Sequence, residues 1–135
     1  MMKTILAALL SVSGVTAVSG GFLAAGSTPA QAKDAHVVRA KATRTAAGTW
    51  RFDVTVKSAD TGWKKYADRW QVLGPDGKVL GTRILYHPHV DEQPFTRSLG
   101  GVRIPKGVTK VTIRARDKVS GYGGKSVTLI LKPGS

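Results

Sequence analysis

The sequence has 135 residues, no cysteine, and 21 lysine and arginine residues against 8 aspartate and glutamate residues, which gives a formal net charge of +13. The absence of cysteine excludes disulfide bonds, thiol chemistry and thiolate metal sites. The positive charge favours polyanionic partners or simply a soluble cationic surface, and charge alone does not distinguish the two.

Residues 1–32 have the pattern of a secretory signal peptide. Lys3 is followed by no charged residue until Lys33, and residues 30–32 (Ala-Gln-Ala) form a small-x-small cleavage signal. The alternative is a membrane anchor, but many small and polar residues make the stretch a weak spanning helix. We therefore expect cleavage after residue 32, one domain at 33–135 without a transmembrane span, and a periplasmic or secreted location.

The mature sequence alternates apolar and polar residues in short stretches separated by turn residues, which predicts strands. The clearest stretch is 50–57, where alternate residues from Trp50 to Val56 are aromatic or β-branched. Gly74-Pro75-Asp76-Gly77 predicts a tight turn, with proline at its first corner and a glycine at positive φ. The expected strands are 36–44, 50–57, 68–73, 79–86, 96–104, 108–116 and 127–131.

This pattern predicts an all-β fold. Seven short strands with a turn about every ten residues favour a seven-stranded antiparallel β-sandwich of the immunoglobulin or fibronectin type III kind. A small barrel is the alternative. We expect Val38, Ala40 and Ala42 on one face of the first strand, a bulge or bend at Gly100-Gly101, and a loose end at 33–35.

The stretch 87–98 concentrates the residues with chemical potential. Pro88 biases His87 to an extended backbone, so the imidazoles of His87 and His89 should lie on the same side. Two imidazoles can share copper or zinc, and Glu92 is the candidate third ligand, with Asp91 or Asp60 as substitutes.

A structural role for this stretch is the alternative to a metal site. The histidines would then bond to carboxylates or backbone, and Arg97 would pair with the carboxylates. No third ligand has diagnostic spacing, so we favour this role and expect no cofactor.

Aromatic residues in the loop before the third strand offer a candidate ligand surface. Trp63, Tyr66 and Arg97 are its members, and lysines interleave with the rings, as suits carbohydrate or single-stranded nucleic acid. An exported location disfavours nucleic acid. The structural alternative is that Trp70 is core and Trp63 plugs one end of the sandwich.

Basic residues alternate along three of the expected strands. They form a patch only where the strands share a sheet. The residues are Arg39, Lys41, Arg51, Lys57, Lys110, Arg114 and Arg116.

One set of motifs resembles an uncharacterised family of small exported bacterial proteins. The resemblance covers about residues 50–115, implies a periplasmic or secreted β-sandwich, and assigns no activity or residue role. The motifs are Gly62-Trp63, Tyr66-Ala67-Asp68, Trp70, the stretch 87–99 (His-Pro-His-Val-Asp-Glu-Gln-Pro-Phe-Thr-Arg-Ser-Leu) and Ile104-Pro105.

These observations predict an exported, non-enzymatic binding or structural accessory protein of the bacterial envelope. Its basic surface would face an anionic envelope component or an acidic protein. The alternative is a periplasmic copper- or zinc-binding protein that uses the segment from His87 to His89. An enzyme ranks third, because the sequence has no recognisable catalytic set.

Overall fold

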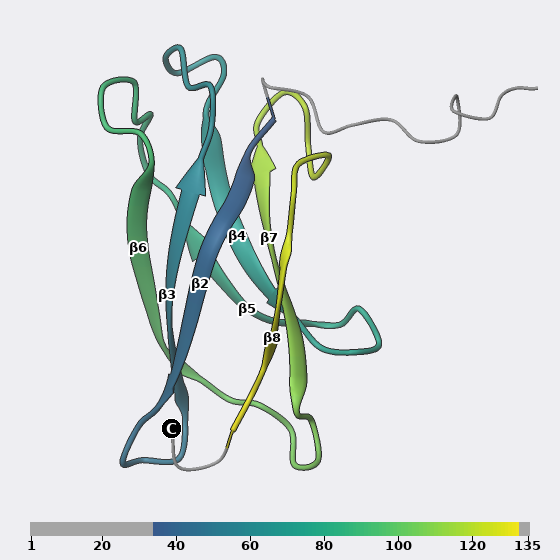
Figure 1. Cartoon of the computed structure of the whole chain (residues 1–135). Coiled ribbons are helices and arrows are strands. Elements are labelled where there is room, and N and C mark those ends of the chain that lie inside the picture. The colour runs from purple at the N-terminus through teal and green to yellow at the C-terminus, as the bar shows by residue number, and fades with distance from the viewer. Residues whose placement is uncertain (1–33, 133–135) are drawn as a thin grey trace, which may run out of the picture.

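The computed structural model describes residues 34–132, so the predicted signal peptide lies outside the described residues (Figure 1). The described residues contain no helix that is long and apolar enough to cross a membrane. The strands are β2 (His36–Arg44), β3 (Trp50–Lys57), β4 (Ala67–Leu73), β5 (Val79–Ile84), β6 (Phe95–Val102), β7 (Lys110–Asp117) and β8 (Val127–Ile130).

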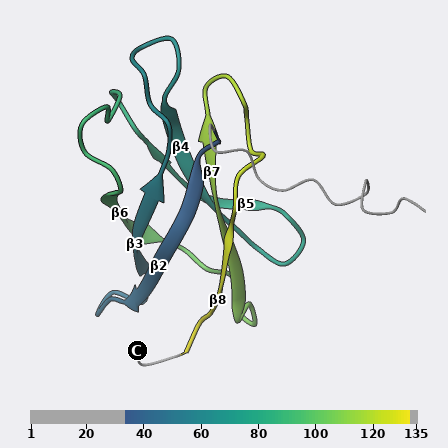
Figure 2. The same cartoon turned by 45° about the horizontal axis from the view of Figure 1, so that its top comes forward.

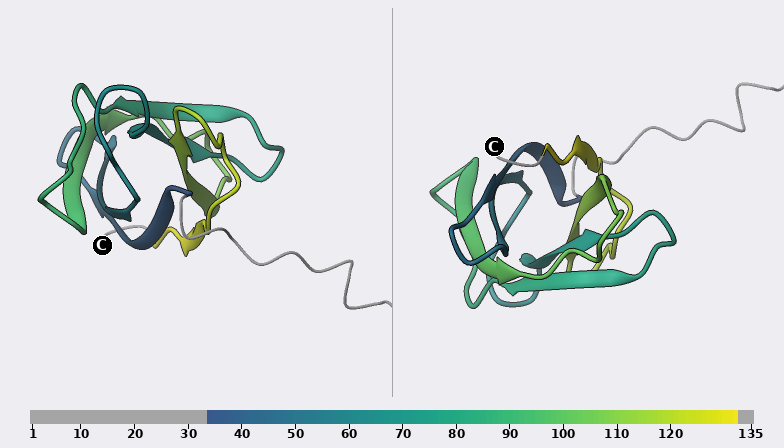
Figure 3. Two further views of the ribbon diagram at one scale, coloured as in Figure 1. Left: turned by 90° about the horizontal axis from the view of Figure 1, so that it is seen from above. Right: turned by 90° about the horizontal axis from the view of Figure 1, so that it is seen from below.

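The strands form two antiparallel sheets. One has the order β2-β3-β6 and the other the order β5-β4-β7-β8. Viewed along the domain, the sheets face each other, with β2 beside β8 on one side and β5 beside β6 on the other (Figure 3). The described residues therefore confirm an all-β fold of seven strands in two antiparallel sheets, with no helix.

The core lies between the two sheets. Alternate residues of each central strand point inward, as the period of two requires. Trp70 of β4 and Phe52 of β3 are fully buried, and Ile113 of β7 packs with them. Burying each such side chain contributes about 1.5–3 kcal/mol to the free energy of folding. The stability of the domain depends on this burial, because a chain without cysteine forms no disulfide bonds.

A bulge changes the facing of the first strand. The pairing of β2 with β3 shifts between Val37 and Arg39. Val37 is buried, whereas Val38 is 48% exposed. The prediction that Val38 shares a face with Ala40 and Ala42 is therefore wrong, because an extra residue reverses the alternation at this point.

The predicted irregularity at Gly100-Gly101 is confirmed. Trp50 pairs with Val102 while Phe52 pairs with Leu99, so Gly100 and Gly101 lie opposite Arg51 alone and β6 has one extra residue at this point. Gly101 has φ +67°, which other residues rarely adopt.

The start of the domain is packed, so the predicted loose end at 33–35 is wrong for its two described residues. Asp34 and Ala35 are 5% and 0% exposed because the β7–β8 loop covers them. Lys125 N donates to His36 Nδ1 at 3.0 Å. A Cβ at Gly124 would lie 1.9 Å from the Ala35 carbonyl oxygen, so this close approach requires glycine.

The connections gather at two ends of the domain (Figures 1 and 2). We call one the three-loop end. It holds the β3–β4 loop (58–66), the β5–β6 segment (85–94), the β7–β8 loop (118–126) and the start of β2. The β2–β3 turn, the β6–β7 connection (103–109) and Lys132 lie at the opposite end.

Candidate functional site at the three-loop end

The structure brings the two predicted histidines together. The ring centroids of His87 and His89 are 4.6 Å apart. The His89 ring is buried and stacks on Phe95, with centroids 3.8 Å apart and planes 9° from parallel. His87 is exposed, and its Nδ1 lies 3.0 Å from the Pro88 carbonyl oxygen.

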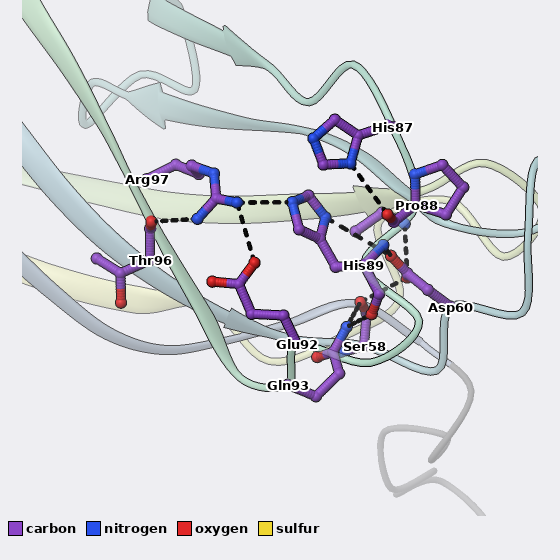
Figure 4. A network of polar contacts seen from close by, with 10 residues as sticks. Ser58, Asp60, His87, Pro88, His89, Glu92, Gln93, Thr96 and Arg97 are labelled. Carbon is purple, nitrogen blue, oxygen red and sulfur yellow. Dashed lines mark hydrogen bonds and ion pairs between the residues drawn. The ribbon is translucent and has the colours of Figure 1, made fainter.

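Asp60 holds the β5–β6 segment in place (Figure 4). Its Oδ2 accepts a hydrogen bond from His89 N at 2.8 Å. Its Oδ1 accepts from Ser58 Oγ at 2.6 Å and from Ala67 N at 3.0 Å. One buried carboxylate thus joins the β3–β4 loop, the start of β4 and the histidine segment.

Gln93 provides a second connection between the same two segments (Figure 4). Ser58 N donates to Gln93 Oε1 at 2.9 Å. Gln93 Nε2 donates to the His89 carbonyl oxygen at 2.8 Å and to Ser58 Oγ at 3.2 Å. No sequence signal predicts this contact, because Ser58 and Gln93 are 35 residues apart and nothing in their spacing links them.

Arg97 of β6 occupies the far side of the His89 ring. Arg97 Nη2 lies 3.0 Å from His89 Nε2 and 3.1 Å from Glu92 Oε1. A guanidinium only donates hydrogen bonds, so Nε2 accepts and the proton of the neutral ring is on Nδ1. That nitrogen is 3.9 Å from Asp60 Oδ2, which is too long for a hydrogen bond.

These surroundings favour the neutral form of His89. Burial lowers the pKa of His89 below its ordinary value of 6.5, and the charges of Arg97 and His87 lower it further. The nearby carboxylates Glu92 and Asp60 raise it by less. For Glu92 itself, the hydrogen bond from Arg97 lowers the pKa of the carboxyl group.

The geometry does not favour the metal site predicted at His87, His89 and Glu92. Arg97 contacts both His89 and Glu92, and its positive charge would oppose a cation between them. Within residues 34–132, no group of three or more metal-ligating side chains is placed to hold an ion. The copper or zinc site stays a prediction.

Asp117 holds the β7–β8 loop as Asp60 holds the histidine segment. Its Oδ1 accepts from Val119 N at 2.7 Å and from Ser120 N at 3.0 Å. Its Oδ2 accepts from Lys65 Nζ at 2.5 Å. Burial would raise the pKa of Asp117, but the lysine and the two backbone N–H groups lower it below its ordinary value.

Two members of the predicted ligand surface lie together, and the third lies elsewhere. The rings of Trp63 and Tyr66 meet edge to face, with centroids 5.8 Å apart. Trp63 is 63% exposed, so the alternative that it plugs one end of the sandwich is wrong. Among the contacts of residues 34–132, none joins Arg97 to either ring, because Arg97 faces His89 instead. The other part of the structural alternative is confirmed, because Trp70 is fully buried in the core.

The basic residues divide between two outer faces. β2 and β3 share a sheet, whereas β7 belongs to the other. On the β7 face, Arg114 donates twice to Gln71 Oε1, at 2.9 and 3.1 Å, and lies 3.8 Å above the Tyr122 ring. The first face carries Arg39, Lys41, Arg51 and Lys57, and the second carries Lys110, Arg114 and Arg116.

A hollow in the surface lies away from the histidines. Its volume is about 450 Å³, and it lies at the opposite end of the domain between the β2–β3 turn and the β6–β7 connection. Trp50, Ile104 and Leu131 form part of its wall. None of the residues of the His89 cluster lines this hollow. The His89 ring is instead packed between Phe95 and Arg97.

Comparison with known proteins gives one informative relative. A protein of Halomicrobium mukohataei named "Putative lipoprotein" is 40% identical over 84 residues, which are 62% of this chain and 41% of that protein. The chain therefore spans less than half the length of this relative. Its name states no activity, in agreement with the resemblance to an uncharacterised family. No protein-family model and no solved structure matches the chain.

Replacing Asp60 should destabilise the domain. In Asp60→Asn, an amide N–H₂ replaces one accepting oxygen, so at least one buried donor loses its partner. We expect the free energy of unfolding to fall by about 2–3 kcal/mol, measured by urea denaturation. The matched control is Asp91→Asn, which makes the same charge change at an exposed site and should shift stability by less than about 0.5 kcal/mol. Equal losses would contradict this role of Asp60.

Stability should depend on the protonation of His89. The folded state lowers the pKa of His89, so the unfolded chain binds more protons and stability falls as the pH drops through and below about 6.5. Urea denaturation between about pH 7.5 and pH 5.5 should show this slope. His89→Gln should flatten it, whereas His87→Gln should retain it. A slope unchanged in His89→Gln would assign the pH dependence to another group.

Proposed function

We propose that this protein is an exported, non-enzymatic binding module of the cell envelope whose cationic surface meets an anionic partner. The observation that carries the proposal is the segregation of charge between interior and surface. Three of the eight carboxylates, Asp34, Asp60 and Asp117, are buried, whereas no lysine or arginine of residues 34–132 is buried. The surface is therefore more cationic than the composition indicates.

Of the carboxylates that remain at the surface, three are paired with arginines, and each pair uses one cation and one carboxylate, so the excess of cations persists. Asp53 pairs with Arg51, Asp68 with Arg116, and Glu92 with Arg97. A surface with this excess of cations attracts polyanions over a distance set by ionic strength, roughly 8–10 Å in physiological salt. Such attraction gives recruitment rather than turnover, which agrees with a packed His89 cluster.

An envelope location is part of the proposal. It is supported by the signal-peptide pattern of residues 1–32 and by similarity to a protein named as a lipoprotein. A periplasmic or secreted position is compatible with a domain that contains no cysteine and depends on its core alone.

The proposal includes a relationship to immunoglobulin-like or fibronectin type III-like sandwiches. A three-stranded sheet, β2-β3-β6, faces a four-stranded sheet in which β5 pairs with β4. In constant-type immunoglobulin domains the fourth strand in chain order, which corresponds to β5, belongs instead to the sheet that contains the first, second and fifth strands. Antibody variable domains use the loops at one end for recognition, and the three-loop end is the corresponding place here.

Binding to soluble and membrane-borne polyanions tests the function. The exported protein should bind dextran sulfate and vesicles that contain phosphatidylglycerol at low salt, and should release both as ionic strength rises. Neutral dextran should not bind. Lys41→Glu/Lys57→Glu should weaken binding to dextran sulfate by about 25-fold, on the basis of roughly 1 kcal/mol per cation. Absence of binding to both polyanions at low salt would refute the proposed function.

Metal binding remains the second candidate, and the 4.6 Å separation of the two imidazole rings is the observation in its favour. Calorimetric titration with zinc or copper decides it. A metal-binding protein would give a stoichiometric heat that His87→Ala/His89→Ala abolishes. Because Arg97 already uses His89 Nε2, we expect no stoichiometric heat with the unmodified protein. Arg97→Ala frees His89 Nε2, so the informative comparison is the heat of zinc or copper titration in this variant against that of the unmodified protein.

A further inference from the structure

Two loops at the three-loop end present an exposed surface that combines apolar and cationic side chains. We call it the aromatic–lysine patch, and its members are Trp63, Lys64, Tyr66, Lys118 and Val119. Trp63 is 63% exposed and Val119 is 66% exposed. Lys64 and Lys118 are exposed beside them. Apolar side chains that are exposed together and rimmed by polar residues can mark an interaction surface.

The patch is held in one arrangement by contacts between its two loops. Lys118 N donates to the Tyr66 carbonyl oxygen at 2.9 Å. Lys118 Nζ donates to the Trp63 carbonyl oxygen at 3.0 Å and lies 5.6 Å from the Tyr66 ring. The ion pair between the half-buried Lys65 and the buried Asp117 joins the same loops. A preformed surface loses little conformational entropy on binding.

The charge of these two loops is one-sided. Their carboxylate Asp60, and Asp117 at the end of β7, are both buried and hydrogen-bonded. The exposed charged side chains of residues 58–66 and 118–126 are Lys64, Lys118 and Lys125. A partner of this surface therefore meets positive charge together with apolar surface.

An anionic lipid surface fits this combination better than a sugar does. Tryptophan prefers the lipid–water interface, and lysines beside it are attracted to anionic headgroups. Sugar hydroxyl groups both donate and accept hydrogen bonds, so a sugar-binding tryptophan is best supported by acceptors as well as donors near its ring. Here the nearby carboxylates of Asp60 and Asp117 face inward and accept bonds from the protein itself.

We propose that the aromatic–lysine patch docks on an anionic lipid surface, with Trp63 and Val119 entering the interface and Lys64 and Lys118 meeting the headgroups. The inference rests on the proposed function and names its partner as anionic lipid. Contact of this kind is reversible, because it depends on a few apolar side chains and screened charges.

The position of the first strand supports this orientation. β2 begins at the three-loop end, where Ala35 and His36 pack against Gly124 and Lys125. The predicted signal peptide ends only a few residues earlier, at residue 32. The end of the domain to which this predicted segment connects is therefore the three-loop end, the same end that carries the aromatic–lysine patch.

Tryptophan fluorescence can test the docking at one residue. Trp50 and Trp70 are 6% and 0% exposed, so only Trp63 can change its contact with solvent when lipid binds. A change in tryptophan emission therefore reports Trp63. Vesicles of phosphatidylcholine with phosphatidylglycerol should shift the emission to the blue, and brominated acyl chains should quench it. Vesicles of phosphatidylcholine alone should do neither. Trp63→Phe should abolish both changes.

Charge-matched variants separate local docking from general attraction. Lys64→Glu/Lys118→Glu should weaken binding to the anionic vesicles by about 25-fold or more, at roughly fivefold or more for each lysine. Lys106→Glu/Lys110→Glu makes the same charge change at the opposite end and should weaken binding by less than about fivefold. Because Lys118 also bonds to the β3–β4 loop, Lys64→Glu alone is the second variant, with a loss of about fivefold.

Each contrary outcome has a distinct meaning. Equal losses in the two double variants, without quenching of Trp63, would overturn docking through this patch and leave the proposed function intact. Binding to dextran sulfate without binding to anionic vesicles would overturn lipid as the partner. Failure to bind either polyanion would refute the proposed function, and the docking inference with it.

Discussion

A carboxylate can be buried only where hydrogen bonds replace its lost hydration, and the three-loop end is arranged around this requirement. Asp60 meets it with donors from Ser58, Ala67 and His89. Those donors belong to the β3–β4 loop, the start of β4 and the β5–β6 segment. Removing the carboxylate would leave these three segments without a common partner. The chain has no disulfide bond that could hold them together in its place.

The same requirement connects the interior to the surface charge. Each carboxylate that faces inward to collect backbone N–H groups is absent from the surface, where lysines and arginines remain. Asp117 shows this for the β7–β8 loop, whose exposed charges are Lys118 and Lys125. The cationic character of the domain is therefore partly a result of how its loops are held, in addition to its composition.

Much of the fold could be predicted from the sequence, because period-two alternation and turn residues are local signals. Alternate inward residues of β3 and β7, the turn at Gly74 to Gly77 and the bulge at Gly100-Gly101 all follow from short patterns. The reversal at Val38 could not be predicted, because a bulge leaves no mark in a run of alanine, valine and basic residues. The packing of Ala35 depends on Gly124, almost ninety residues away.

The candidate site was predictable in composition but only partly in arrangement. The pair of His87 and His89 and the pairing of Glu92 with Arg97 follow from their proximity in sequence. The bond of Asp60 to His89 and the position of Lys118 beside Trp63 depend on which loops share an end, and this is set by the sheet order. Exposure of Trp63 is likewise a property of the assembled loops, since the residue type alone favours burial.

The placement of the first and last described residues at opposite ends has a practical consequence for handling the protein. Asp34 lies beneath the β7–β8 loop, whereas Lys132 lies near Ala42 and Trp50 at the far end. A purification tag or surface linkage placed before Asp34 would crowd the loops and obscure their contacts. Immobilisation through the C-terminal side instead turns all three loops towards the solution, which is the orientation that a biosensor measurement requires.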